Sequence, residues 1–234
     1  MQIVYEDNHI IIVNKESGEI VQGDKTGDTP LSELVKQYIK EKYQKPGEVF
    51  LGVVHRLDRP VSGLVVFART SKALTRLNKM FAEGAVHKTY WAIVEKRKEG
   101  MERRLDTEMP DSSLLTHWLT RNEQQNKSYA YDHEVPRSKK AQLRYRLLSQ
   151  GDNYDLVEVE LMTGRHHQIR CQLAAIGSPI RGDLKYGARR SNPDGSISLM
   201  SRRIEFIHPV SKAQISVEAP LPRDPLWNSL SLKV

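Results

Sequence analysis

Asp58 is the residue of this sequence that is best placed to do chemistry. It lies in segment 55–63, which reads HRLDRPVSG, and short Val-rich runs at 49–54 and 64–68 predict a strand on either side. The sequence therefore predicts a carboxylate on a loop between two rigid elements. A lone loop aspartate most commonly caps a turn and pairs with its neighbours, so a catalytic role needs support from the rest of the chain.

The residues beside Asp58 limit its charge state and its freedom. Arg56 and Arg59 flank it, and a carboxylate between two guanidinium groups stays ionised well below neutral pH. Pro60 and Gly63 restrict the backbone conformations that the loop can take. We therefore expect Asp58 to be an oriented anion.

A second polar segment, 163–170, reads TGRHHQIR and follows a predicted strand at 154–162. Gly164 ends that strand, and apolar residues at helical spacing predict a helix that ends at Gly177. Backbone N–H groups at a helix start attract anions, and residues 165–190 include six basic residues and one aspartate. Phosphate is the expected ligand of this segment.

The charge of the chain suits a partner that carries phosphates. The formal net charge is +7 and the sequence pI is about 9.4. Residues 1–54 contain six lysines and nine acidic residues, a net charge of −3, so residues 55–234 carry +10. Segment 137–146 alone has five basic residues and no acid, which fits a phosphate backbone about as well as a solvated surface. Nucleic acid is the partner class that this balance favours.

His166 and His167 invite a metal hypothesis that the sequence does not favour. Adjacent residues cannot point the same way on a helix, and no HExxH motif or acidic cluster accompanies them. We therefore expect no metal, and we predict that neutral imidazoles hydrogen-bond to RNA or to the backbone.

Residues 86–95 have the β-branched and aromatic content of a strand. Strand alternation places Lys88 and Tyr90 on one face of it. From this strand alone, a buried core tyrosine is an equally good interpretation of Tyr90.

Periodicity predicts an α+β fold in a single domain that spans residues 1–234. Residues 96–136 show no sustained period, and we interpret them as an insertion that contains a hairpin. The further predicted elements are strands at 2–5, 9–14 and 141–148, a helix with Thr29 as N-cap and Pro30 at its first position, and a helix from a Thr70-Ser71 cap to Gly84.

Cys171 is the single cysteine, which excludes an internal disulfide and suits a packing role in a reducing compartment. The N-terminus has no basic segment followed by an apolar one, and no run approaches 18 apolar residues. We expect a soluble, cytoplasmic monomer with no membrane contact.

Four pieces of the chain occur together in a recognisable order: segment 55–63, Lys-Thr-Tyr at 88–90, segment 163–170, and Gly-Asp with Tyr-Gly in 182–187. This set resembles the RluA family of RNA pseudouridine synthases, and the resemblance runs over roughly residues 3–221. The first and third pieces are long and specific. The resemblance implies a central mixed, mostly antiparallel sheet with flanking helices, and isomerisation of uridine in tRNA, rRNA or both without a cofactor or metal.

The resemblance also implies roles for single residues. Asp58 matches the essential aspartate, and Arg56 matches the arginine that enters the base stack where the target uridine has been flipped out. Tyr90 matches the tyrosine whose ring lies on the uracil, and Arg170 matches the basic residue that pairs with the aspartate. The expected RNA-binding set is Arg56, His55, Arg59, Lys88, Arg165, His167 and Gln168.

The sequence departs from the family pattern at two places outside these residues. Glu16 stands where proline is usual, and residues 199–201 read Leu-Met-Ser where Leu-His-Ala is common. We expect no small S4-type RNA-binding domain before Ile3, and we therefore expect substrate selection to depend on the catalytic domain itself.

Two other functions compete with the isomerase hypothesis. The charge of +10 after residue 54 also fits a non-catalytic, basic RNA-binding protein, in which Asp58 would be dispensable. A hydrolase that uses Asp58 on a phosphorylated small molecule is the weakest hypothesis, because the sequence lacks a metal-ligand set and a Gly-rich phosphate loop.

Overall fold

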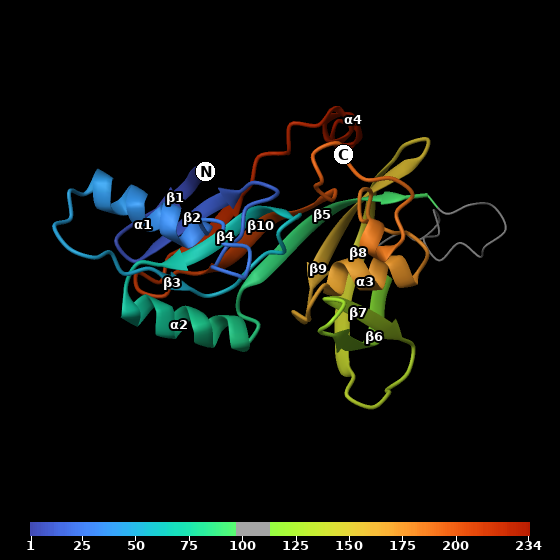
Figure 1. Cartoon of the computed structure of the whole chain (residues 1–234), viewed down its shortest axis with the longest axis horizontal. Coiled ribbons are helices and arrows are strands. Elements are labelled where there is room, and N and C mark those ends of the chain that lie inside the picture. Colours follow the sequence, from blue (N-terminus) through green and yellow to red (C-terminus); the bar gives the residue numbers. More distant parts are fainter. Residues whose placement is uncertain (97–112) are drawn as a thin grey trace. The chain divides into compact units, whose positions relative to one another are not determined.

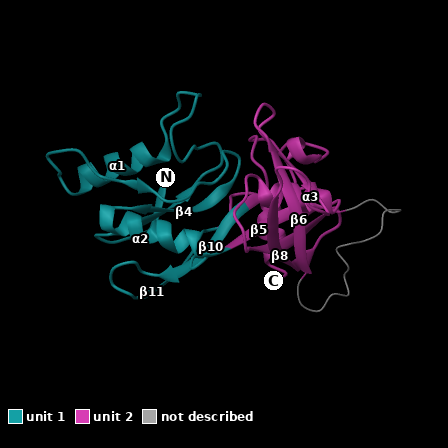
Figure 2. Ribbon diagram, turned by 90° about the horizontal axis from the view of Figure 1, so that it is seen from below, with its two compact units in different colours: residues 1–88, 200–220 teal, residues 89–199, 221–234 magenta. Residues whose placement is uncertain are grey.

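A computed structural model describes residues 1–96 and 113–234. The chain divides into two compact units (Figure 2), one of residues 1–88 and 200–220 and the other of residues 89–199 and 221–234. Residues 97–112, part of the insertion predicted at 96–136, lie outside the described residues. The single domain that the sequence predicted stays a prediction.

The first unit is a sheet in which four strands follow one another in the order β1, β2, β4, β10 (Figure 1). The short strand β3 pairs with β4, and β11 pairs with β10. All of these pairings are antiparallel except that of β10 with β4. The strands are β1 (Gln2–Glu6), β2 (Ile10–Lys15), β3 (Gly52–Val53), β4 (Ser62–Ala68), β10 (Leu199–Ile207) and β11 (Gln214–Glu218).

Two helices of the first unit begin in different ways. Helix α2 (Ser71–Ala82) begins as predicted, because the Thr70 hydroxyl accepts the backbone N–H of Ala73 at 3.2 Å. Helix α1 (Leu31–Lys42) has Pro30 as its N-cap, so the prediction of Thr29 was wrong by one residue. The backbone carbonyl groups of residues 20 and 21 accept the first two helical N–H groups, so that no capping side chain is needed.

The second unit is an antiparallel sheet in the order β5, β9, β8, β6, β7. Strands β6 and β7 form the hairpin expected within residues 96–136. The elements are β5 (His87–Glu95, of which the first two residues belong to the first unit), β6 (Ser113–Asn122), β7 (Lys127–Tyr131), β8 (Lys139–Gln150), β9 (Tyr154–Leu161), α3 (Gln168–Ala175), a 3₁₀ turn (Leu184–Tyr186) and α4 (Pro225–Ser231).

Helix α3 packs against one face of the β7-β6-β8 sheet. Leu119 and Ala141 of the sheet meet Cys171 of the helix in a buried cluster. Burial raises the pKa of the Cys171 thiol to about 12, as expected of a packing residue.

The α+β class and the mixed, mostly antiparallel sheet are confirmed. The strand predicted at 49–54 was too long, since β3 has only two paired residues. Gly52 explains the close fit there, because a Cβ on it would lie 2.7 Å from the Leu74 side chain of α2.

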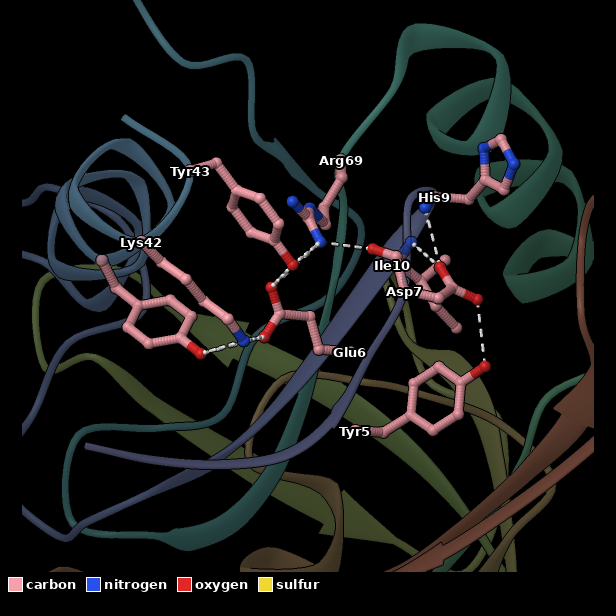
Figure 3. Close-up of polar contacts among 9 residues, drawn as sticks. Tyr5, Glu6, Asp7, His9, Ile10, Lys42, Tyr43 and Arg69 are labelled. Atoms are coloured by element: carbon pink, nitrogen blue, oxygen red, sulfur yellow. Dashed lines mark hydrogen bonds and ion pairs between the residues drawn. The ribbon is translucent and has the colours of Figure 1, made fainter. Parts of the chain in front are cut away.

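Glu6, at the end of β1, ties helix α1 to the sheet (Figure 3). Its buried carboxylate accepts hydrogen bonds from Tyr38 at 2.9 Å, Lys42 at 2.7 Å, Tyr43 at 2.7 Å and Arg69 at 3.0 Å. Burial by itself raises the pKa of Glu6, but the hydrogen bonds outweigh burial and hold this pKa below its ordinary value of 4.5.

Asp7 closes the turn between β1 and β2 in the same region (Figure 3). Its carboxylate accepts the backbone N–H groups of His9 at 2.7 Å and Ile10 at 2.8 Å, together with the Tyr5 hydroxyl at 3.0 Å. Nε2 of the fully buried His208 lies 2.9 Å from Asp7 Oδ2, the oxygen that also accepts the Tyr5 hydroxyl. The Asp7 side chain therefore fixes the turn between the two strands predicted at 2–5 and 9–14.

Replacing Glu6 by glutamine should lower the free energy of unfolding near neutral pH by about 1–2 kcal/mol, because the charged acceptor of several hydrogen bonds is lost. Since the folded pKa of Glu6 is depressed, its stabilisation is present above about pH 4.5 and is lost as the pH falls.

Urea unfolding followed by circular dichroism at about pH 7 and about pH 3 measures both effects. The difference between wild type and Glu6→Gln should shrink in acid, and Glu48→Gln, at an exposed position, is the control. An equal difference at the two pH values would contradict the prediction.

Candidate functional site

Asp58 lies on the loop between β3 and β4, as the sequence predicted. The loop ends in a turn in which the backbone N–H of Val61 donates to the Asp58 carbonyl at 3.0 Å. The Asp58 side chain is half-buried, and Arg56 is exposed two residues before it. The carboxylate is thus attached to backbone of defined conformation.

Lys15 holds this loop from inside the protein. Its side chain is 0% exposed, and its ammonium donates to the backbone carbonyls of Glu16 at 3.0 Å, Arg59 at 3.0 Å and Val61 at 2.6 Å. Burial lowers the pKa of Lys15 to about 8, against the opposing effect of nearby carboxylates that include Asp58. Lys15 therefore ties the end of β2 to Arg59 and Val61, which follow Asp58 in the turn.

Two further contacts restrain the loop. The Ser17 hydroxyl donates to the Pro60 carbonyl at 3.2 Å, and the Gly18 N–H donates to the Arg59 carbonyl at 2.9 Å. Gly63 has a φ of +107°, and a Cβ there would lie 2.3 Å from the Ser201 carbonyl oxygen of β10. Only glycine fits this position.

His55 and Lys88 both lie close to the Phe81 ring. The His55 ring stacks on Phe81 with centroids 4.8 Å apart, and the Lys88 ammonium lies 5.4 Å from the centre of the same ring. The Val66 N–H donates to His55 Nε2 at 2.9 Å, which ties the start of the loop to β4. Burial, with the Lys88 charge, lowers the pKa of His55 to about 3, so the imidazole is neutral.

Arg59 does not flank Asp58 in the way that the sequence predicted. Its guanidinium group contacts Asp28 at 2.7 Å, the Thr26 hydroxyl at 2.7 Å and Asp24 at 3.6 Å. Within the part of the chain that the structure describes, Arg59 makes no ion pair with Asp58. The prediction was wrong because these acids come from a loop about 30 residues earlier, which the local sequence does not reveal.

Arg170, on α3 in the second unit, forms a buried bidentate pair with Asp183. Its Nε lies 2.7 Å from Oδ2 and its Nη2 lies 2.9 Å from Oδ1. The guanidinium carbon is 5.1 Å from the centre of the Tyr186 ring. The sequence motif contained Asp183 and Tyr186, but sequence reasoning did not identify them as the partners of Arg170. The pairing of Arg170 with Asp58 joins residues of different units and stays a prediction.

The two histidines before α3 point the same way, contrary to the sequence prediction. Their rings stack at 3.8 Å, because both precede the helix and His167 has a left-handed φ of +51°. His167 Nδ1 is 2.9 Å from the Tyr186 hydroxyl, and His166 contacts the Ser128 hydroxyl at 2.9 Å. Burial, helped by the Arg170 charge, lowers the pKa of His167 to about 2.

Gln168 fixes the turn that leads into α3. Its buried side-chain oxygen accepts the Thr163 hydroxyl at 2.8 Å and the Arg165 N–H at 2.9 Å, and its amide donates to the Gln142 carbonyl at 3.0 Å. Arg165 is exposed and donates from Nε to the Lys140 carbonyl at 3.1 Å.

Tyr90 is 7% exposed and pairs with Val159 across β5 and β9. The predicted site residues thus fall into two sets, each described within its own unit: His55, Arg56, Asp58, Arg59 and Lys88 in the first, and Tyr90, Arg165, His167, Gln168 and Arg170 in the second. Sequence reasoning missed Lys15, whose only signal was a charged residue at the end of an otherwise apolar strand.

Within the described ranges, no group of three or more histidine, cysteine or acidic side chains could bind a metal ion. Among the same residues, no helix is long and apolar enough to cross a membrane.

Comparison with known proteins gives a consistent result. A family model described as RNA pseudouridylate synthase matches residues 9–175. The chain is 30% identical to ribosomal large subunit pseudouridine synthase D of Zymomonas mobilis, over 96% of this chain and 70% of that protein. It is 31% identical to ribosomal large subunit pseudouridine synthase C of Vibrio cholerae, over 94% of this chain and 65% of that protein. The chain thus spans about two thirds of the length of these relatives.

Two solved human structures share the fold. RNA pseudouridylate synthase domain containing 4 superposes with a TM-score of 0.73 at 21% identity, over 95% of this chain and 89% of that one. RNA pseudouridylate synthase domain containing 1 superposes with a TM-score of 0.70 at 21% identity, over 97% of this chain and 86% of that one.

Replacing Lys15 by methionine tests its buried charge. The folded pKa of about 8 lies below the ordinary 10.5, so between these values the unfolded chain binds more protons than the folded one. The contribution of Lys15 to the free energy of unfolding should therefore increase as the pH rises from about 8 to about 10.5.

The measurement is urea unfolding of wild type and Lys15→Met across this pH range. The stability difference, wild type minus variant, should rise with pH, whereas Lys40→Met on the exposed face of α1 should give a flat difference. A flat difference for Lys15→Met would show that its ammonium is not desolvated.

Proposed function

The chain belongs to the RNA pseudouridylate synthase family and carries the motifs of its RluA members, and from this premise we propose that it isomerises uridine in RNA with Asp58 as the catalytic carboxylate. The observation that carries the assignment is the construction of the Asp58 loop. Lys15 at the end of β2, Ser17 and Gly18 just after it, and Gly63 in β4 fix this loop. Such support is what a catalytic group needs to keep one position.

The reaction breaks the bond between C1′ and N1 of uridine and forms a bond between C1′ and C5. No water, redox change or cofactor is consumed, so one ionised carboxylate is the main requirement. Asp58 can meet it by adding to the sugar or base, by stabilising positive charge at C1′, or by removing a sugar proton. All three routes need a carboxylate that stays charged and in place.

Arg56 is proposed to occupy the gap that the target base leaves. Extruding a stacked base costs roughly a few kcal/mol, and a planar guanidinium can stack in its place. The exposed position of Arg56, two residues from Asp58, supports this role.

Tyr90 and Arg170 are the other proposed catalytic residues. The Tyr90 ring offers a flat surface for uracil, and its hydroxyl is a candidate to remove the C5 proton. Arg170 is proposed to pair with Asp58 and keep it ionised. Its bidentate pair with Asp183 uses Nε and Nη2, and so fixes the guanidinium plane before substrate binds.

The remaining predicted RNA contacts differ in what supports them. Arg165 is exposed and Lys88 is half-exposed, which suits contact with phosphate. Arg59 is proposed to bind RNA while it keeps its contacts to Asp24 and Asp28. The last three predicted RNA contacts are His55, His167 and Gln168. Their side chains hydrogen-bond within the protein, which favours a role in positioning the loops that carry them.

We infer that the substrate is tRNA, rRNA or both, and that the protein is a cytoplasmic monomer that needs no metal ion. Two relatives are named for the large ribosomal subunit, which supports rRNA. Mapping pseudouridines by chemical labelling in cells with and without the gene identifies the target.

Asp58→Asn should abolish release of tritium from RNA labelled at uracil C5, with a loss of at least about 1,000-fold. Total RNA from cells that lack the gene is the substrate, and RNA affinity should change little. Asp152→Asn, at an exposed position, is the matched control. Turnover by Asp58→Asn would refute the isomerase assignment and favour the non-catalytic RNA-binding alternative.

Arg170→Lys should lower kcat about 10- to 100-fold, because lysine cannot reproduce the bidentate pair and the charge is misplaced. KM should change less than kcat if Arg170 acts on the reacting groups rather than on RNA affinity. The matched control is Arg223→Lys at an exposed position. A folded variant with an unchanged kcat would remove Arg170 from the catalytic set.

A further inference from the structure

Helix α3 lies against one face of the β7-β6-β8 sheet (Figure 1). Leu119, Ala130 and Ala141 pack toward α3. Because side chains alternate along a strand, their neighbours in sequence lie on the opposite face. That opposite face is called the outer face below.

An aromatic row crosses the outer face. Tyr131 of β7 is paired with Trp118 of β6, and Trp118 is paired with Lys140 of β8. Directly paired residues of antiparallel strands have adjacent side chains on the same face, so two aromatic rings and an ammonium group lie side by side. Tyr131 is 38% exposed, Trp118 is half-buried and Lys140 is exposed.

Positive charge borders the aromatic row. On β7, Tyr129 is 38% exposed. The Lys127 ammonium lies 5.5 Å from the centre of the Tyr129 ring and 5.3 Å from that of Tyr186, which packs on the α3 side, so Lys127 lies at the edge of the sheet between its two faces. Among residues 1–96 and 113–234, neither Lys127 nor Lys140 makes an ion pair. Further along β8, the outer face continues with Arg144 and Arg146, which pair with Glu160 at 3.9 Å and Glu158 at 2.8 Å. The positive charges that lack an ion pair among the described residues, Lys127 and Lys140, therefore lie beside the aromatic rings.

We propose that this outer face binds a single-stranded segment of the RNA substrate, with successive bases stacked on Tyr131 and Trp118 and the backbone phosphates at Lys140 and Lys127. The inference rests on the proposed function and adds to it a second area of RNA contact. Every base has a π face, so such stacking tolerates any sequence, and strand-borne aromatic residues are a known platform for it.

The charge of the row favours RNA over a second copy of the chain. A symmetric dimer through this face would bring Lys140 and Lys127 of one copy toward the same positively charged surface of the other copy, which disfavours association. A phosphate backbone instead neutralises both lysines.

The test measures binding of a fluorescein-labelled oligouridylate of about twelve nucleotides to the full chain by fluorescence anisotropy. Tyr131→Ala and Trp118→Ala should each weaken binding about tenfold, the usual effect of losing one stacked base. Tyr131→Phe keeps the ring and should bind like wild type. Phe50→Ala removes an aromatic ring that is 47% exposed elsewhere and is the matched control.

Salt dependence separates the lysines from the rings. Lys140→Gln should reduce the slope of log affinity against log salt concentration by about 0.7, the value for one phosphate contact on a single strand. Tyr131→Ala should leave this slope unchanged, because stacking releases no counterion.

The outcomes for this surface are independent of catalysis. Asp58→Asn should bind the oligouridylate like wild type, so a failure of the isomerase assignment leaves this measurement intact. Oligouridylate binding by Tyr131→Ala within twofold of wild type would overturn the proposal, even if Trp118→Ala fails to fold. It would also be overturned if Tyr131→Phe bound as weakly as Tyr131→Ala, or if the alanine variant changed the oligomeric state instead of RNA affinity.

Discussion

The buried ammonium group of Lys15 is the interaction on which the geometry around Asp58 depends. An ammonium group removed from water costs several kcal/mol unless its donors find acceptors. Three backbone carbonyls meet that need, and two of them, at Arg59 and Val61, belong to the turn that follows Asp58. The cost of burying Lys15 therefore becomes a constraint on the loop, because a shift of the turn would remove two of the three acceptors of the ammonium group.

The second unit uses the same principle with a different pair of groups. Arg170 and Asp183 are both nearly fully buried, and each satisfies the other through two hydrogen bonds. Such a pair is weak support for stability but strong support for orientation, because either group alone would be a buried charge. Tyr186 lies against the guanidinium group and also accepts the Ser128 N–H, so that the pair is tied to the β6–β7 hairpin.

The elements of this fold were predictable from sequence because their signals are local. The apolar run at the start of β2 and the Thr70 cap of α2 depend on residues within a few positions of one another. Partner choice is different. Arg59 bonds to Asp28 rather than Asp58, and Arg170 bonds to Asp183, because tertiary folding brings distant segments together. Sequence spacing selected these arginines as candidates but did not identify Asp28 and Asp183 as their partners.

The two departures from the family pattern show why this loop tolerates some changes and not others. Glu16 replaces a usual proline, yet Lys15 contacts only the backbone carbonyl of Glu16. The backbone N–H of Glu16 also donates to the Glu19 carboxylate at 2.8 Å, a bond that proline cannot make. Ser201 meets Gly63 through the backbone, and its buried hydroxyl has no hydrogen-bond partner among the described residues. Backbone contacts accept any side chain that fits, whereas Lys15 acts through its ammonium group and Gly63 through its lack of a Cβ.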